Sequence, residues 1–347
     1  MKVLVLSDIA DISASGRQRL WAIEQNAEVV HVLAKHQFVP WLPVISSRVA
    51  KLMRKPMWVR NHRRLGNELI RACDELQPDI IWLEWPREIS RETMHRIRQA
   101  SPNAYLISFQ DDNPWGDRNA DRWQWEAYFQ VVPLFDMHLV KRPCDILNLS
   151  ELGAKNCREW LHGIFPPLFF PPEAGHERIY PMTFVGTCMD QRATFIGRLL
   201  DAGLPVHVFG SHWAKRSTLP RRFPDNFHPA VKGEAYADVL RKSQISLGFV
   251  SESNCDEWTM RTYEVPACGS MFLAQRTPTH ERWYSEGTEA EFFTTASECI
   301  QQATLLLKEP DRCHAIAKAG LEKCQQLGTL SDRVAELFTH LRQSRNR

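Results

Sequence analysis

The stretch MTFVGTCMDQRATFIGRLLDA, residues 182–202, indicates the fold most directly: an apolar run stops at Gly186, and helical spacing begins at Arg192. Residues 206–210 form a second short apolar run that also stops at a glycine. A strand, a helix and a strand in this order predict parallel strands joined by a right-handed crossover. The pattern continues downstream, so residues 173–325 are expected to form one Rossmann-like, doubly wound parallel sheet.

The N-terminal part of the chain shows the same alternation. Apolar runs that predict strands lie at residues 3–6, 29–33, 79–83, 104–109 and 135–140, with helical spacing between several of them. Prolines then concentrate in FPPLFFPP, residues 165–172. Because proline interrupts both helices and sheets, this segment is the expected domain boundary. The sequence therefore predicts an α/β protein with two Rossmann-like domains that face a central cleft.

The composition excludes several classes of function. The 43 basic residues are nearly matched by 41 acidic ones, and a net charge of +2 predicts no general affinity for nucleic acid. The first apolar run is too short for a signal peptide, and no stretch reaches the roughly 20 apolar residues of a membrane span. Nine cysteines without a CxxC pair or zinc spacing indicate reduced thiols. We therefore expect a cytoplasmic protein without a metal or other cofactor.

Polar groups follow the ends of the predicted strands, where open parallel sheets bind their ligands. After residues 182–185 come Gly186, Thr187 and, at the start of the next helix, Arg192. Backbone N–H groups, the helix dipole and a guanidinium all favour an anion, so this loop is a candidate diphosphate site. Gly16, after the first strand, is a candidate for approaching the phosphates from the opposite wall. The alternative is that Gly186 only turns the chain and Arg192 is solvated.

The densest group of polar residues lies between Ser251 and Gly269. Arg261 and Glu264 stand three residues apart on a predicted helix and therefore share one of its faces. A carboxylate there can accept hydrogen bonds from both ribose hydroxyls of a nucleotide, and an arginine beside it can neutralise phosphate. The alternative is an ion pair within the helix, which contributes only a few tenths of a kcal/mol.

Polar residues also follow the predicted strand at 104–109. Asp111 and Asp112 are candidate catalytic carboxylates that orient or deprotonate an acceptor hydroxyl. Asn113 and Trp115 are candidate acceptor-binding residues, the second because aromatic faces stack on sugar rings. Helix capping, loop structure and ordinary packing are the alternatives. Adjacent aspartates lack the DxD spacing of a divalent-metal site, so no metal ligand is predicted.

A basic, amphipathic stretch spans Arg48 to Arg64 and carries seven lysines and arginines. Such a stretch can lie on the anionic inner surface of a membrane, where each cation contributes about 1 kcal/mol, or can hold an acidic acceptor. A solvated helix face is the ordinary alternative.

Residues 243–293 closely resemble the C-terminal domain of the CgeB-like (spore-maturation-protein-like) glycosyltransferases. The resemblance is carried by SQISLGF (243–249), TMRTYEVPACG (259–269), Arg276-Thr277 with His280, and EGTEAEFF (286–293). Shorter pieces look like the same family: DII (79–81), QDDNP (110–114), Phe135-Asp136 with Gly153-Ala154, and FVG (184–186) with Arg192. The resemblance covers nearly the whole chain and is most specific in its C-terminal third.

The resemblance implies a GT-B fold. Its expected parts are an acceptor-side domain (1–172), a nucleotide-sugar donor domain (173–325) and a C-terminal helix (326–347) that packs back toward the first domain. Arg261 and Glu264 are implied donor-site residues, with Glu264 at the nucleotide ribose. The wider retaining families often show two glutamates separated by seven residues, and the earlier position here is Asp256, a shorter acid. Asp256 is therefore a third catalytic candidate, and retention versus inversion stays open.

The expected activity is metal-independent transfer of a sugar from a nucleotide-sugar to a hydroxyl of a glycan, a lipid-linked saccharide or a surface-layer acceptor, as in polysaccharide biosynthesis. One alternative is a non-catalytic nucleotide-sugar-binding or scaffold protein of surface assembly. Another is a sugar-nucleotide epimerase, which would release nucleotide without an acceptor. His280 and Glu286 match positions of the family to which the resemblance assigns no chemical task.

Overall fold

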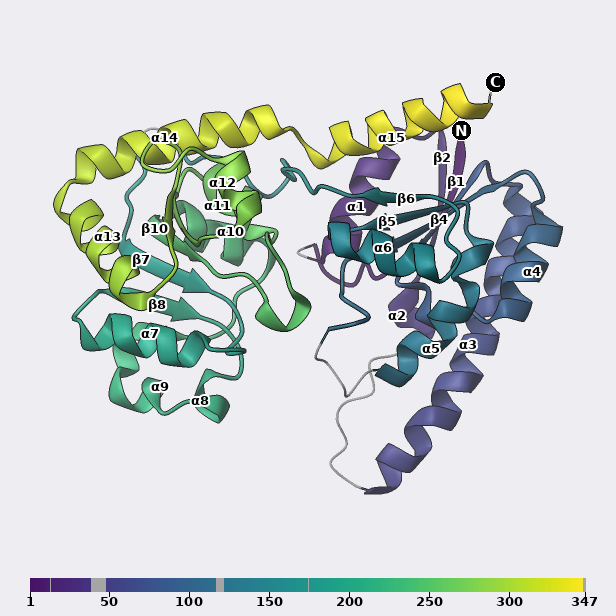
Figure 1. The fold of residues 1–347 in the computed structure, drawn as a ribbon, viewed down its shortest axis with the longest axis horizontal. Coiled ribbons are helices and arrows are strands. Elements are labelled where there is room, and N and C mark those ends of the chain that lie inside the picture. Colours follow the sequence, from purple (N-terminus) through teal and green to yellow (C-terminus); the bar gives the residue numbers. More distant parts are fainter. Residues whose placement is uncertain (13, 39–47, 117–121, 174, 346–347) are drawn as a thin grey trace. The chain divides into compact units, whose positions relative to one another are not determined.

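The computed structural model describes residues 1–345 except 13, 39–47, 117–121 and 174, and it describes only the backbone of residues 48–61, 122–124 and 344–345. The chain divides into two compact units (Figure 1). Unit 1 is Met1–Leu161 with Ser331–Arg347, and unit 2 is His162–Leu330. Within the described residues, each unit contains one six-stranded sheet in which all neighbouring strands are parallel.

The sheet of unit 1 has the strand order β2-β1-β3-β4-β5-β6. Its strands are β1 (Lys2–Ser7), β2 (Val29–Ala34), β3 (Ile80–Glu84), β4 (Tyr105–Gln110), β5 (Met137–Val140) and β6 (Cys157–Glu159). Its helices are α1 (Ser15–Glu24), α2 (Lys35–Phe38), α3 (Arg48–Leu76), α4 (Arg91–Ala100), α5 (Arg122–Val131), α6 (Pro143–Glu151) and α15 (Leu330–Arg345), with short 3-10 turns η1 (Pro86–Glu88) and η3 (Val132–Leu134). The central strands β3, β4 and β5 are buried along nearly their whole length, as in parallel sheets with helices on both faces.

One face of this sheet packs against α3, α4 and α5. Leu69, Ile97 and Tyr128 from these helices form one buried cluster with Leu6 and Leu83 from the strands. Ser90 caps α4 by accepting a hydrogen bond from the backbone N–H of Thr93 at 3.1 Å. The apolar side chains of α15 are buried as well; they are Val334, Leu337, Phe338 and Leu341. The start of α15 is held by the side-chain amide of Asn26, which donates to Ser331 Oγ at 2.9 Å.

The sheet of unit 2 has the strand order β12-β11-β10-β7-β8-β9. Its strands are β7 (Tyr180–Val185), β8 (Val206–Phe209), β9 (Phe227–His228), β10 (Ser243–Gly248), β11 (Met271–Gln275) and β12 (Glu291–Phe293). Its helices are α7 (Arg192–Asp201), α8 (Trp213–Arg216), α9 (Leu219–Arg222), α10 (Gly233–Arg241), α11 (Arg261–Ala267), α12 (Pro278–Trp283), α13 (Ala296–Lys308) and α14 (Pro310–Leu327), with 3-10 turns η4 (Pro224–Asn226) and η5 (Glu252–Asn254). The first strand, β7, lies between β8 and β10, which is the Rossmann order.

The core of unit 2 lies between one sheet face and helices α7, α13 and α14. Phe184 and Leu247 from the strands, Leu199 from α7 and Ile316 from α14 belong to one buried cluster. Gly269 ends α11 with a φ of 68°, a left-handed conformation that glycine adopts without strain. These contacts fix the loops that leave the carboxyl ends of β7, β8 and β10.

The predicted fold class, two Rossmann-like parallel α/β sheets, is confirmed. Helix α10 ends at Arg241, and Ser243 already belongs to β10, where its hydroxyl donates to the carbonyl of Val239. No helix in the described part of the chain is long and apolar enough to cross a membrane.

Candidate functional site

The chain order of unit 2 reverses between β7 and β10, and such a switch point leaves a crevice at the carboxyl ends of the two strands. The loop after β7 begins at Gly186, and the loop after β10 contains Val250 and Ser251. Arg192, the first residue of α7, joins these loops, because its guanidinium donates to the carbonyls of Thr187 at 3.2 Å and Val250 at 3.3 Å.

Two glycines allow the loops after β7 and β8 to approach each other. A Cβ on Gly210 would lie 2.0 Å from the carbonyl oxygen of Gly186, so no larger residue fits without moving the backbone. A Cβ on Gly186 would lie 2.7 Å from the Phe184 ring and 3.1 Å from Nη2 of Arg261. The indole of Trp213 donates to the Gly186 carbonyl at 2.9 Å and fixes this arrangement.

Arg192 and Arg261 bring two positive charges to the Gly186 loop. Their guanidinium carbons lie 5.5 and 5.8 Å from the centroid of the same Phe184 ring. Burial and, next, the charge of Arg261 lower the pKa of Arg192 from its ordinary 12.5 to about 10. Nε of Arg192 is buried without a hydrogen-bond partner among the described residues. Two cations so placed, each without an ion pair in the described structure, make this loop electropositive.

The alternative interpretation of Arg261 and Glu264, an ion pair within α11, is not what the structure shows. Each of the two side chains instead forms a hydrogen bond with a different element of the described structure. Nε of Arg261 donates to the carbonyl of Val185 at 2.7 Å, at the end of β7. Glu264 Oε2 accepts a hydrogen bond from the hydroxyl of Tyr236 on α10 at 2.6 Å. The hydrogen bonds of the two side chains thus go to α10 and to the end of β7 rather than to each other.

Glu264 is a buried carboxyl group. Burial raises its pKa from the ordinary 4.5 to about 7, although the hydrogen bond from Tyr236 and the charge of Arg261 act in the opposite direction. A ligand that donates hydrogen bonds to this carboxylate would replace the lost solvation. A ribose diol is one such ligand, since its two hydroxyls can both donate.

A small cavity of about 80 Å³ opens beside Arg192 at the carboxyl ends of the strands. Its walls include Phe195, Phe249 and Phe293, and its polar residues include Glu252 and Gln275. A cavity of this size holds a few water molecules or one small polar group, whereas a drug-sized ligand needs a few hundred Å³.

Asp256 lies half-buried in the loop between η5 and α11, where its backbone N–H donates to the carbonyl of Ser251 at 3.0 Å. The neighbouring Glu257 points to α12 and accepts a hydrogen bond from Thr279 Oγ1 at 2.6 Å. Of the two acids, Glu257 thus links the loop to α12.

His280 and Glu286 have structural partners. His280 is fully buried, with Nδ1 at 2.7 Å from the carbonyl of Gln275 and Nε2 at 2.9 Å from Thr262 Oγ1. Glu286 accepts two hydrogen bonds from Arg276, at 2.6 and 2.8 Å. These contacts connect α11, α12 and the end of β11. They give His280 and Glu286 structural roles.

In unit 1 the chain order reverses between β1 and β3, and a buried polar cluster fills that position. Glu84, at the end of β3, accepts hydrogen bonds from Arg19 Nε at 2.6 Å and Arg19 Nη2 at 2.9 Å. Ser7, at the end of β1, donates to the same carboxylate at 2.6 Å. Gly16 is packed against this cluster, since a Cβ there would lie 2.2 Å from Ser7 Oγ. This packing explains why position 16 is a glycine, independently of the predicted phosphate contact.

The cluster extends to Asp111. The indole of Trp85 donates to Asp111 Oδ1 at 2.6 Å, and Arg19 Nη1 lies 3.9 Å from Oδ2. Trp85 itself is left-handed, with a φ of 44°, a conformation that costs a non-glycine residue roughly 1–3 kcal/mol. The Asp111 side chain is 26% exposed, so its carboxylate, fixed by the hydrogen bond from Trp85, reaches the surface of unit 1.

The other predicted residues near Asp111 form its loop. Asp112 is half-buried, and its carbonyl accepts a hydrogen bond from Gln110 Nε2 at 2.9 Å. Asn113 Oδ1 accepts from the backbone N–H of Trp115 at 2.9 Å, which is an Asx turn. Trp115 is 38% exposed and stacks on Phe129, with ring centroids 5.5 Å apart. One face of this indole is thus occupied by protein.

Residues 192–339 match the model of a family described as glycosyl transferase-like. Sucrose-phosphate synthase from Thermosynechococcus elongatus is similar in structure, with a TM-score of 0.66 at 14% identity over 99% of this chain and 100% of that one. HepE from Anabaena, in complex with UDP-glucose, gives 0.61 at 10% identity over 99% and 100%. A putative UDP-N-acetylglucosamine 2-epimerase from Listeria monocytogenes gives 0.51 at 13% identity over 92% and 90%.

No curated protein matches the chain. The structural likenesses show the GT-B fold, and the family match over residues 192–339 supports the expected glycosyltransferase. The narrower assignment to the CgeB-like group stays a prediction.

The matched residues 192–339 include Arg192, Arg261 and Glu264. The structure brings Arg192 and Arg261 together beside Gly186 and Thr187, whereas Glu264, one turn further along α11, bonds to Tyr236 of α10. Asp111, Asp112, Asn113, Trp115 and Gly16 belong to unit 1. For the basic stretch from Arg48 to Arg64, the side chains of residues 48–61 lie outside the described residues. Among the described residues, no three His, Cys, Asp or Glu side chains gather in a way that could hold a metal ion.

Sequence reasoning missed Tyr236 and the Arg19–Glu84 pair. A signal for Glu84 exists in the sequence, since it is a charged residue that closes the apolar run of β3. Tyr236 carries no such signal, because it lies 28 residues before its partner in an ordinary amphipathic helix.

Proposed function

We propose that the chain transfers a sugar from a nucleotide-sugar to a hydroxyl group of a glycan, a lipid-linked saccharide or a surface-layer acceptor. The observation that carries the proposal is the pair of guanidinium groups, Arg192 and Arg261, held over one Phe184 ring beside a glycine loop. Fixed cations and backbone N–H groups at a helix start suit a diphosphate. HepE, which shares the fold, is seen in complex with UDP-glucose.

In the proposed reaction the bond from the sugar C1 to the donor diphosphate breaks, and a bond from C1 to the acceptor oxygen forms. Arg192 and Arg261 would stabilise the charge that develops on the leaving diphosphate, so that no metal is required for this task. Glu264 would hold the ribose hydroxyls. Asp111, Asp112 and Asp256 are the proposed carboxylates for the acceptor proton or the reacting sugar, and Asn113 and Trp115 would contact the acceptor.

The donor site is tested first by a thermal-shift screen of the full chain against UDP-, GDP-, ADP-, CMP- and TDP-sugars, since a ligand of the native state raises its melting temperature. Arg261→Ala should lower the affinity for the stabilising nucleotide roughly 10- to 100-fold, which corresponds to a lost charged hydrogen bond. Arg282→Ala, at an exposed arginine of the same unit, is the matched control. Equal affinities of the two variants would remove Arg261 from the donor site.

Turnover is tested by nucleotide release with candidate acceptors. Release that requires an acceptor supports transfer. Release without any acceptor supports the epimerase alternative, whose fold is represented by the Listeria monocytogenes protein. Binding of a nucleotide-sugar without release under any condition would support the non-catalytic alternative.

A further inference from the structure

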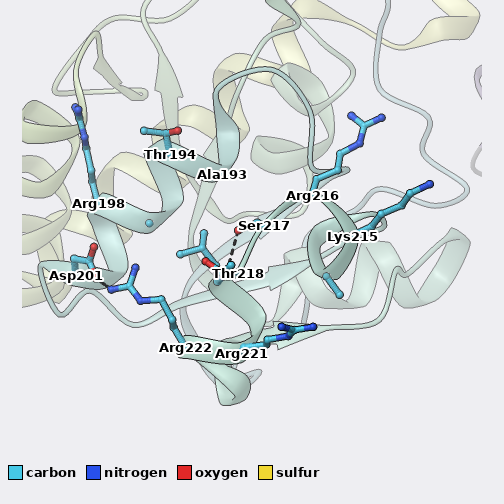
Figure 2. A pocket seen from close by; sticks show the side chains of 13 residues that line it. Ala193, Thr194, Arg198, Asp201, Lys215, Arg216, Ser217, Thr218, Arg221 and Arg222 are labelled. Carbon is cyan, nitrogen blue, oxygen red and sulfur yellow. Dashed lines mark hydrogen bonds and ion pairs between the residues drawn. The ribbon is translucent and has the colours of Figure 1, made fainter.

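Unit 2 carries a wide hollow lined by residues of α7, α8 and α9 and of the segments beside them (Figure 2). Its volume is about 740 Å³, within the range of small-ligand sites. Five cationic side chains line it, against the single carboxylate of Asp201; they are Arg198, Lys215, Arg216, Arg221 and Arg222. We call this site the basic hollow.

The floor of the basic hollow is built from small and buried residues. Gly197 on α7 allows Leu219 of α9 to approach closely, since a Cβ at Gly197 would lie 3.3 Å from Leu219 Cδ2. Leu219 is buried in the core of unit 2, and Ser217 Oγ accepts the backbone N–H of Leu219 at 3.0 Å. The positions of the surrounding cations are therefore set by elements that pack into the core.

The cations of the basic hollow are only partly neutralised. Arg222 pairs with Asp201 at 2.6 Å, and Arg216 donates to the carbonyl of Cys188 at 3.2 Å. Arg198, Lys215 and Arg221 are exposed and form no ion pair with another described residue. Figure 2 shows these three around the hollow, on α7, α8 and α9 respectively.

The charge is local, because the whole chain has a net charge of only +2. Ordinary protein surfaces intersperse both signs, since gathered like charges repel one another. A ligand with several negative charges would relieve this repulsion. A guanidinium group can bind two oxygens of one phosphate, and Thr194 and Thr218, which also line the hollow, carry hydroxyl donors.

We propose that the basic hollow binds a ligand that carries several phosphate groups. None of the residues that line the basic hollow is assigned to the donor site, and this proposal does not depend on the proposed function. Phosphates of this kind come either from the headgroups of an anionic membrane or from a soluble oligophosphate. Both sources present the same chemistry to Arg198, Lys215 and Arg221.

The test compares two triple variants of the full chain. Arg198→Gln/Lys215→Gln/Arg221→Gln removes the unpaired cations of the hollow. Arg282→Gln/Lys308→Gln/Lys318→Gln removes three exposed cations elsewhere in unit 2 and is the control with equal net charge. One arm measures co-sedimentation with vesicles of equal parts phosphatidylglycerol and phosphatidylcholine, and the other measures binding of tripolyphosphate by calorimetry.

Each cation near an anionic surface raises affinity about fivefold. The variant that lacks Arg198, Lys215 and Arg221 should therefore bind the phosphate ligand roughly a hundredfold more weakly than the unmodified chain. The control triple should stay within a fewfold of it. Loss confined to the vesicle arm identifies a membrane as the source, and loss confined to tripolyphosphate identifies a soluble ligand. Absence of binding in both arms, or equal losses in the two triples, would overturn the proposal.

Discussion

Glu264→Gln should change how the stability of the chain depends on pH. The folded-state pKa of Glu264 is about 7, against an ordinary 4.5. Below the ordinary value the carboxyl is protonated in both states, and between the two values only the unfolded state is ionised. Rising pH in this window therefore favours unfolding, and a shift of this size corresponds to about 3 kcal/mol. Glutamine keeps the shape and can still accept the hydrogen bond from Tyr236, but does not ionise.

The measurable quantity is the difference in melting temperature between the unmodified chain and Glu264→Gln across pH 4 to 8. Half-buried His62 and buried His138 have pKa values lowered to about 4 and contribute a slope of the opposite sign, but both are present in both proteins and cancel in the difference. For a unit of this size, 3 kcal/mol corresponds to roughly 6–12 °C. Glu264→Gln should gain that much relative to the unmodified chain as pH rises from about 4.5 to 7.

Glu322→Gln, at an exposed glutamate of α14, is the matched control and should follow the unmodified chain. A difference curve for Glu264→Gln that is flat between pH 4.5 and 7 would refute the reasoning, because it would mean that Glu264 is ionised in the folded state without cost. The same site makes a linked prediction. UDP binding at pH 6 should release protons if the ribose hydroxyls donate to the ionised carboxylate, and calorimetry in buffers of different ionisation enthalpy would detect their release.

Three further perturbations follow from the described contacts. Gly210→Ala places a Cβ against the carbonyl of Gly186 and should destabilise unit 2 by roughly 1–3 kcal/mol, read as a lower melting temperature; an unchanged value would show that the two loops separate freely. Arg192→Lys keeps a charge but cannot hold both loop carbonyls, so nucleotide affinity should fall about tenfold or more by calorimetry, and full retention would argue for charge alone. Asp111→Asn preserves the acceptor for the Trp85 indole while removing a base, so kcat should fall roughly 10²–10⁴-fold with the donor KM unchanged; an equal rate would exclude Asp111 as the base.

Much of the fold could be predicted from the sequence because its central strands are apolar runs that end on glycine or on a polar residue. β7 and β8 illustrate this, with Gly186 and Gly210 immediately after them. The edge strands β6, β9 and β12 were not predicted. They have only two or three residues each, and so short a segment shows no periodicity and depends on its neighbour for its conformation.

The site could be predicted in part. Arg192, Arg261 and Glu264 could be predicted because they lie at or near the start of helices that follow predicted strands, and such positions can be recognised in the sequence alone. Their partners were not, because the hydrogen bond from Tyr236 to Glu264 and the indole of Trp85 on Asp111 join residues that only the folded chain brings together. The left-handed backbone of Trp85 has no sequence signal at all, since a tryptophan there gives no hint of a positive φ.

The position of α15 affects the order in which the protein is made. Unit 1 contains Ser331–Arg347, so every residue of unit 2 leaves the ribosome before unit 1 has its last helix. Until then unit 1 lacks helix α15, whose side chains Val334, Leu337 and Phe338 are buried in the folded protein. Unit 2, by contrast, is one continuous segment of the sequence. Unit 1 is therefore complete in sequence only after all of unit 2 has been synthesised.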